Sequence, residues 1–244
     1  GRVQTPTLAM LVERARQISN FQKEKYFNVE LDCDGIPAVK PKIFDPDEAE
    51  QLRSRCQGSE AIVTAVKETE KKVKAPKLYD LTTLQREANR IYGMTAKQTL
   101  DTAQSLYEKK LITYPRTDSQ YLTEDMEQTA RNVVRQIYEK YQLTGPFDQP
   151  EQPDVKKVMN NSKVTDHHAI IPTMELASCH LDELKSWEEK ILFLIAVHTV
   201  MAMSKDHIYQ ETEIEVECQE EIFKAKGKIC LLYTSPSPRD MRRS

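Results

Sequence analysis

Two stretches that alternate apolar and polar residues flank a long block with helical periodicity, and this order constrains the fold more than any other feature. Residues 27–33 place every second, apolar side chain on one side, and residues 211–218 do the same with glutamates on the other side. The block at 76–205 is mainly helical in pattern. A β region interrupted by a helical domain requires its two parts to meet in space. The order therefore predicts a multidomain α+β fold.

The strand regions contain further local signals. Asp34-Gly35 follows the first alternating stretch and is typical of a hairpin turn. Asp45 can cap a helix that starts with proline. Three more elements are predicted here: a helix at 46–56, a strand at 61–66, and a strand at 222–229 that forms a hairpin with the glutamate-rich one.

The helical block and the N-terminus show start and stop signals. Thr5-Pro6 predicts the start of a helix over 6–20. Gly93 ends one helix, Thr95 caps the next, and residues 111–115 read as an extended segment, which is a winged-helix-like order of helix, turn, helix and strand. Longer helices are predicted at 124–141 and 181–203.

Composition narrows the class of protein without naming a function. No apolar run approaches the roughly 20 residues that span a bilayer, and the N-terminus has no secretion-signal pattern. The five scattered cysteines include no CxxC pair, which argues against a zinc site and fits a reducing cytoplasm. Gly1 reads as a cut inside a longer frame, and the aperiodic residues 231–244 read as a non-native tail.

The net charge of −3 does not favour nucleic acid, but the charge is unevenly distributed. The stretch from Lys67 to Lys97 holds eight basic and four acidic residues. Such a stretch can meet phosphates, or it can form a solvated face, and charge alone does not decide between the two.

Three short segments carry residues suited to phosphate chemistry. GRVQTPTL, at 1–8, places polar groups just ahead of a helix start, where free N–H groups favour anions. ITYPRTDS, at 112–119, sets Arg116 two residues after Tyr114, so a guanidinium could stabilise charge beside a phenol, which is a weak nucleophile with a pKa of about 10. HHAIIPT, at 167–173, offers an imidazole that could bind a phosphate oxygen or move a proton. Each segment alone also fits a purely structural role.

Together, in this order and at these spacings, the three segments resemble the type IA DNA topoisomerases, most closely the topoisomerase III branch. The resemblance covers the chain from Gly1 to about Ile229. It implies an isomerase (EC 5.6.2.1) that cleaves single-stranded DNA transiently through a 5′-phosphotyrosine, passes a strand and religates without ATP.

The resemblance also assigns roles to residues of this chain. Tyr114 matches the nucleophile, Arg116 the arginine that grips the scissile phosphate, and His167 a histidine that binds the strand near the cut. The other motif residues are expected to contact DNA: Arg2, Gln4, Thr117, Asp118, Ser119 and Thr173. His168 receives no firm role.

The family architecture implies a partial toroid whose helical domain is inserted into a β arch. It assigns five segments: 1–22 to the groove-forming domain (domain IV), 23–75 to the arch (domain II), 76–205 to the tyrosine domain (domain III), 206–230 to the returning arch, and 231–244 to the tail. The Mg²⁺ of the family is bound by a TOPRIM domain that this sequence lacks, so no metal ligand is expected here and the chain alone should be nearly inactive. The expected partners are single-stranded DNA and a helicase, with no membrane. The expected location is the bacterial cytoplasm, on nucleoid or plasmid DNA.

Three other interpretations remain open. A tyrosine recombinase also uses Tyr and Arg on DNA, but its Arg and His precede its Tyr, whereas His167 follows Tyr114. A non-catalytic winged-helix module could bind single-stranded DNA with Tyr114 in a structural role. A structural adaptor without nucleic-acid function has only the structural interpretation of each motif in its favour.

Overall fold

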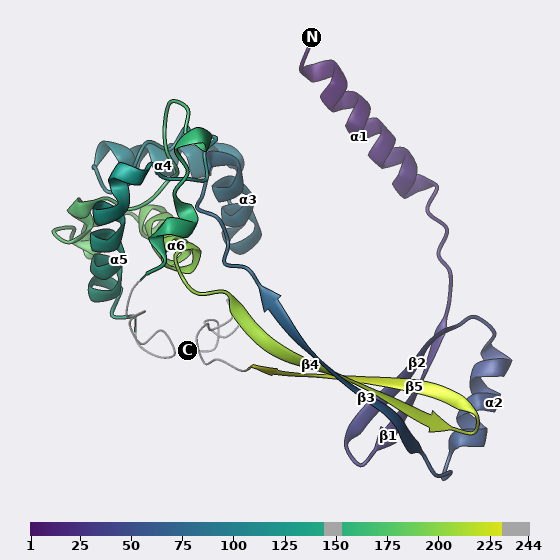
Figure 1. Ribbon diagram of the computed structural model, residues 1–244. Coiled ribbons are helices and arrows are strands. Elements are labelled where there is room, and N and C mark those ends of the chain that lie inside the picture. The colour runs from purple at the N-terminus through teal and green to yellow at the C-terminus, as the bar shows by residue number, and fades with distance from the viewer. Residues whose placement is uncertain (144–152, 231–244) are drawn as a thin grey trace. The chain divides into compact units, whose positions relative to one another are not determined.

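The computed structural model describes residues 1–143 and 153–230, which form two compact units (Figure 1). The sheet unit holds Gly1–Thr69 and Glu211–Ile229, and the helical unit holds Glu70–Gln210. The chain thus leaves the sheet unit, forms the helical unit and returns. The α+β class is confirmed, and the tail at 231–244 lies outside the described residues.

The sheet unit contains one five-stranded sheet in the order β1-β2-β5-β4-β3. β2, from the first strand region, therefore pairs with β5, from the second, which confirms that the two strand regions meet. Its elements are α1 (Gln4–Ser19), β1 (Phe27–Cys33), β2 (Ile36–Ile43), α2 (Pro46–Cys56), β3 (Ile62–Val73), β4 (His207–Cys218) and β5 (Glu221–Cys230).

The β1–β2 hairpin follows from its turn residues. Asp34 and Gly35 both have positive φ, at 51° and 86°, which suits a tight two-residue turn. The pairing that results sets Cys33 opposite Ile36 and Leu31 opposite Ala38. The predicted hairpin is confirmed.

One small core fills the sheet unit beneath α2. The carboxylate of Asp45 accepts a hydrogen bond from the Asp47 backbone N–H at 2.9 Å and so caps α2 as predicted. The helix then buries Leu52 among strand residues that include Val216 and the fully buried Phe223. The core thus joins residues that lie more than 150 positions apart in the chain.

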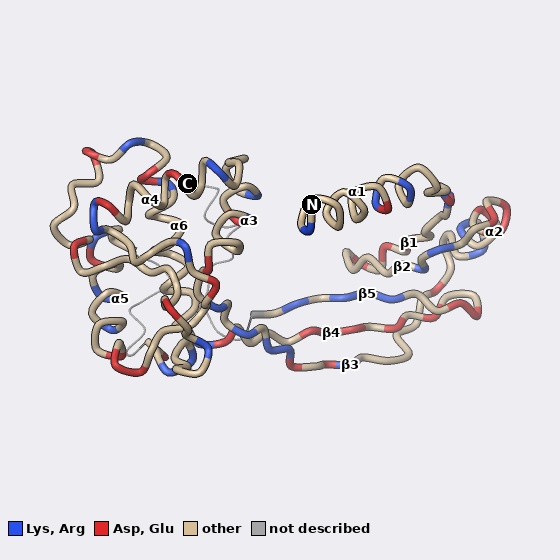
Figure 2. Tube along the Cα trace, turned by 90° about the horizontal axis from the view of Figure 1, so that it is seen from above, with Lys and Arg blue, Asp and Glu red and all other residues tan. Residues whose placement is uncertain are grey.

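A ladder of opposite charges joins residues 211–215 of β4 to β5 (Figure 2). Lys224 pairs with Glu215 at 2.9 Å, Lys228 approaches Glu211 at 3.8 Å, and Lys226 pairs with Glu213 between them. The alternation that places apolar residues on one side of β4 places these glutamates on the other.

The predicted start of α1 is wrong by two residues. The helix begins at Gln4 rather than Pro6, and its N-cap, Val3, makes no side-chain cap. Thr5 lies inside the helix because its backbone N–H already donates to the Gly1 carbonyl at 3.1 Å. Pro6 is tolerated because it stays within the first turn, where an N–H is not required. No residue of α1 is buried.

The described residues of the helical unit form four α-helices and several short 3₁₀ turns. The α-helices are α3 (Leu81–Tyr92), α4 (Ala96–Glu108), α5 (Glu127–Tyr141) and α6 (Ser186–Ala202). The 3₁₀ turns are η1 (Glu124–Met126), η2 (Val155–Val158), η3 (Asn161–Lys163), η4 (Met174–Leu176) and η5 (Leu181–Glu183). No helix in the described part of the chain has the length and apolar character needed to cross a membrane.

The α3–α4 pair confirms the predicted stop and cap. Gly93 ends α3 with φ of 69°, in the left-handed region that suits glycine. Thr95 caps α4, and the side chain of Gln98 reaches back to the Thr95 backbone N–H, which completes a capping box. Asp80 caps α3 in the same way, a feature that the apolar pattern does not reveal.

Other predicted elements differ from the structure in type or in bounds. The segment at 111–115 is not a strand but a single bridge between Ile112 and Pro172, because its polar groups bond to a distant loop. The helix predicted at 181–203 begins at Ser186, since Leu184 and Lys185 adopt extended backbone after η5. Strand β3 runs to Val73 rather than Val66, as charged, exposed residues continue it without any apolar alternation.

A buried carboxylate ties α4 to α6. Glu188 is 3% exposed, and it accepts hydrogen bonds from the Lys109 Nζ at 2.6 Å and the Ser105 hydroxyl at 2.7 Å. The Lys185 backbone N–H donates to it as well, at 3.0 Å. Burial would raise the pKa of this carboxyl, but these donors outweigh burial and hold the pKa at about 2.

Asp206 binds the two ends of the helical unit to each other. Its carboxylate accepts from the Ala75 backbone N–H at 3.2 Å, just after β3, and pairs with Lys72 at 3.3 Å and Lys157 at 3.0 Å. The hydrogen bond from Lys157 leads the set of donors that lower the pKa of Asp206 to about 2. The chain therefore enters and leaves the helical unit side by side.

Candidate functional site

The segment that carries Tyr114 is hydrogen-bonded to the segment that carries His167. The Thr113 backbone N–H donates to the Ile171 carbonyl at 3.0 Å. The Thr113 hydroxyl donates to the Ala169 carbonyl and accepts from the Ile171 N–H, both at 3.0 Å. One threonine thus fixes two motifs that are more than 50 residues apart.

Apolar anchors hold both motifs against the core of the helical unit. Leu111, Ile112 and Pro115 are buried on one side, and Ala169 and Ile170 are buried on the other. Between these anchors, Tyr114 remains half-buried and His167 is exposed. The AII run therefore serves packing, and the residues beside it are left at the surface.

The ring of Tyr114 contacts two other rings. Its centroid lies 4.3 Å from that of His167, with the planes tilted by 48°. Tyr107, on α4, meets it edge-on at 5.4 Å. The structure therefore brings Tyr114 and His167 together. Tyr107 lies on the helix that Thr95 caps, and no pattern in the sequence indicated that it would touch Tyr114.

Arg116 and Asp118 project from the surface beside this ring cluster. Both side chains are exposed, and within the described residues Arg116 has no hydrogen bond or ion pair to another side chain. An exposed guanidinium two residues from a half-buried phenol is free to meet an anion.

Thr117 and Ser119 point inward instead. Thr117 is 7% exposed, and its hydroxyl donates to the His167 carbonyl at 2.9 Å. Ser119 is 4% exposed, and its hydroxyl donates to the Lys163 carbonyl at 2.9 Å. Both residues hold the loop in shape, and Thr117 fixes the backbone of His167 directly.

Thr173, the last residue of the HHAIIPT segment, caps the short helix η4. Its hydroxyl donates to the Lys110 carbonyl and accepts from the Glu175 backbone N–H at 3.3 Å, at the start of η4. The Nδ1–H of His168 donates to the Ala169 carbonyl at 2.9 Å, whereas the His167 ring contacts that of Tyr114. The adjacent histidines therefore have different partners.

Arg2 and Gln4 belong to the sheet unit, whereas Tyr114 belongs to the helical unit. Both side chains are exposed at the N-terminal end of α1. Within the described residues, no group of three or more His, Cys, Asp or Glu side chains could hold a metal ion.

Comparison with known proteins places this geometry among its relatives. Residues 1–232 match the family described as DNA topoisomerase. DNA topoisomerase 3 of Bacillus licheniformis is 38% identical over 93% of this chain and 32% of the relative, and that of Bacillus subtilis gives the same three values. The full-length topoisomerase I of Thermotoga maritima superposes with a TM-score of 0.71 at 28% identity, over 98% of this chain and 42% of that one. The chain thus spans about a third of the length of these curated relatives.

Proposed function

We propose, since this chain belongs to the type IA family of bacterial DNA topoisomerases, that it carries the nucleophile of transient single-strand DNA cleavage. The observation that carries the proposal is the contact between the Tyr114 and His167 rings at 4.3 Å, with the unpaired Arg116 two residues away. In this proposal the Tyr114 hydroxyl attacks a backbone phosphorus. A phosphotyrosine bond forms to the 5′-phosphate, and the bond to the 3′-oxygen breaks.

The protein groups would divide the work of phosphoryl transfer. A phenol with a pKa of about 10 is a poor nucleophile unless a nearby cation stabilises the charge that develops. The Arg116 guanidinium can grip the phosphate with two N–H groups, and the exposed His167 imidazole can hold a neighbouring phosphate oxygen. The phenolic proton leaves as the ester forms, and the released 3′-oxygen takes one up.

Religation would reverse the same step. The phosphotyrosine ester conserves the energy of the broken backbone bond, so the 3′-hydroxyl can attack it and release Tyr114 without ATP. The hydrogen bonds of Thr113 and Thr117 support this because they keep the two motifs in register during both steps.

The remaining expectations of the resemblance are part of the proposal. As the resemblance implies, Mg²⁺ would have its ligands outside the described residues, and no step above depends on it. We further propose DNA contacts at Arg2, Gln4 and Asp118. A helicase is the candidate partner that supplies single strands, and nucleoid or plasmid DNA in the bacterial cytoplasm is the substrate. On its own, the chain would cleave very little.

A chimaera tests the proposal. This chain would replace the matched third of the Bacillus subtilis DNA topoisomerase 3, and the product would be assayed for covalent adducts with a labelled single-stranded oligonucleotide. Tyr114→Phe should abolish the adduct, and Arg116→Gln should slow its formation about 100-fold, as expected for the loss of a preorganised charge.

Tyr141→Phe is the matched control, because the buried Tyr141 hydroxyl has no hydrogen-bond partner among the described residues and its removal should leave the adduct unchanged. If a folded chimaera binds the oligonucleotide and Tyr114→Phe has no effect on any reaction, the non-catalytic single-strand-binding interpretation replaces this one.

A further inference from the structure

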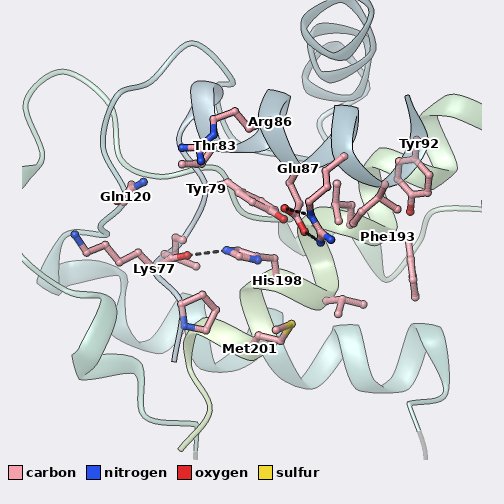
Figure 3. Close-up of a pocket in the computed structure, with 16 residues that line it drawn as sticks. Lys77, Tyr79, Thr83, Arg86, Glu87, Tyr92, Gln120, Phe193, His198 and Met201 are labelled. Carbon is pink, nitrogen blue, oxygen red and sulfur yellow. Dashed lines mark hydrogen bonds and ion pairs between the residues drawn. The ribbon is translucent and has the colours of Figure 1, made fainter. Parts of the chain in front are cut away.

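The helical unit contains a second site that the proposed chemistry does not use. A cleft of about 1160 Å³ opens between the α3 region and α6 (Figure 3). It is larger than the roughly 300–1,000 Å³ of a typical small-molecule pocket. Part of the basic stretch noted in the sequence lines it, which raises the question of what those cations meet.

The cleft carries a net positive charge. Lys77, Arg86 and Arg90 line it, with Glu87 among them. Arg90 donates to the Glu87 carboxylate at 3.0 Å, and this hydrogen bond is the main cause that lowers the pKa of Glu87. Glu87 is thus neutralised by Arg90, while Arg86 is exposed and has no ion pair to a described residue. Lys77 and Arg86 thus have no carboxylate partner among the described residues.

Aromatic rings form the other part of the lining. Tyr79 and His198 stack with centroids 3.7 Å apart and planes at 12°. The His198 Nε2–H donates to the Lys77 carbonyl at 2.7 Å, and burial lowers the pKa of this imidazole. Tyr92 and Phe193 add two half-buried rings. Flat rings beside free cations are the combination that binds unpaired nucleotides, through stacking and phosphate contacts.

The basic rim continues past Lys77. The Lys77 Nζ lies 5.6 Å from the ring centroid of Tyr121, and the Lys163 Nζ lies 4.9 Å from it. Burial acts to raise the pKa of the Tyr121 phenol, but the hydrogen bond from Lys163 and the charge of Lys77 outweigh it and lower the pKa. A third cation and another ring therefore lie next to the cleft.

The chain that forms the wall of the cleft is hydrogen-bonded to the loop that carries Tyr114 and to the segment that carries His167. The Leu81 backbone N–H donates to the Thr117 carbonyl at 3.0 Å, and the Ile170 N–H donates to the Tyr79 carbonyl at 2.8 Å. Gln120, six residues after Tyr114, lines the cleft and donates to Asp80 at 3.1 Å. A DNA strand that is bound at Tyr114 would therefore lie next to the cleft, because both belong to the helical unit.

We infer that this cleft is a second binding subsite for single-stranded DNA, in which Lys77 and Arg86 contact phosphates and the ring-lined floor receives a base. This inference rests on the proposed function, because it assigns the cleft to the same DNA substrate. It adds nucleotides on the helical unit, beyond the residues of the three motifs.

Fluorescence anisotropy of the 244-residue chain with 5′-fluorescein-labelled (dT)₁₂ tests the inference. The double variant Lys77→Gln/Arg86→Gln should bind about tenfold more weakly at 0.1 M salt. The slope of log affinity against log salt should fall by about 1.4, since each lost single-strand phosphate contact removes about 0.7. An abasic 12-mer with the same phosphates should bind the unmodified chain about tenfold more weakly than (dT)₁₂, because it lacks stacking.

The control is Arg135→Gln/Lys140→Gln on α5, which removes the same charge from the same unit outside the cleft. It should leave both affinity and slope nearly unchanged. If both double variants lose the same affinity, or neither loses any, the cleft is not a DNA-binding subsite. If the cleft variant melts at a lower temperature than the control, Arg86→Lys separates charge from folding. This variant keeps the charge and should restore binding.

The two proposals can fail separately. Tyr114→Phe should leave (dT)₁₂ binding and its salt slope intact. At saturating oligonucleotide, the cleft variant of the chimaera should still form the covalent adduct. If the cleft variant loses (dT)₁₂ binding but still forms the adduct, the cleft proposal is supported on its own. If the chimaera forms no adduct but the cleft still binds (dT)₁₂, only the proposed chemistry is rejected.

Discussion

The helical unit and the sheet unit are stabilised by different interactions. Among the described residues, the helical unit buries 29 residues in one core, while the sheet unit buries ten. Hydrophobic burial scales with area, so the first unit has the larger reserve of stability. The sheet unit instead carries exposed charged strands and the β4–β5 ladder (Figure 2).

This difference matches where the candidate chemistry lies. Tyr114 and His167 come from segments far apart in the chain, and only a rigid core with threonine cross-links holds them at a fixed distance. The sheet unit contains no comparable ring cluster among its described residues. We conclude that the fixed geometry around Tyr114 depends on the larger core.

The largest expected effect comes from the small core. Phe223→Ala should destabilise the sheet unit by about 4 kcal/mol, because it removes a fully buried ring from a core with few other members. Hydrogen exchange of peptides from β1 and β2 would report the loss of protection. The fluorescence of Trp187, the single tryptophan and a residue of α6, would report the helical unit.

The unfolding curve of Trp187 in this variant should match that of the unmodified chain. If its midpoint shifts as far as the β-strand protection does, the two units unfold together and the comparison fails.

A smaller effect is expected at the buried carboxylate of the helical unit. Glu188→Gln should cost about 2 kcal/mol, since hydrogen bonds to a charged group are worth about 1.5–3 kcal/mol. The pKa of Glu188 is about 2 in the folded chain, below the ordinary value of 4.5. Its contribution is therefore fully present above about pH 4.5 and is lost as the pH falls towards 2.

Urea unfolding followed by Trp187 fluorescence between pH 6 and pH 2.5 would measure this loss. Glu189→Gln, on the exposed side of the same turn, is the control and should keep the acid sensitivity. An unchanged acid profile in Glu188→Gln would show that another group is responsible.

The smallest effect is expected in the charge ladder. Lys226→Gln should lower the melting temperature of the sheet unit by less than about 2 °C, because both Lys226 and Glu213 are solvent-exposed and screened. The difference should vanish in 1 M NaCl. A drop as large as that of Phe223→Ala would mean that charge pairing, and not the small core, stabilises this unit.

Local signals predicted much of the fold, and long-range contacts account for what they missed. The Asp34-Gly35 turn and the Thr95 cap act within a few residues, so the sequence reveals them directly. Residues 111–115 were predicted to be extended, but the hydrogen bonds of Thr113 go to Ala169 and Ile171, more than 50 positions away. No periodicity in the sequence encodes that pairing.

The candidate site also has parts that could be predicted from the sequence and parts that could not. The proximity of Tyr114 and His167 follows from family resemblance, since 53 positions separate them in the chain. Tyr107 and the cleft at Lys77 and Arg86 were not predicted, because a helical pattern places residues on a face without naming what the face meets. The basic stretch gave a partial signal for the cleft.

The clamp at Asp206 has a consequence for how such a chain can be rearranged. Because Ala75 and Asp206 are joined by a 3.2 Å hydrogen bond, the ends of the helical unit meet at one point. A unit with adjoining ends is a natural cassette: it can be cut out, expressed alone or exchanged for a homologous one, while β3 and β4 are closed by a short turn. Protein engineers could use this junction to graft different tyrosine-bearing units onto one sheet.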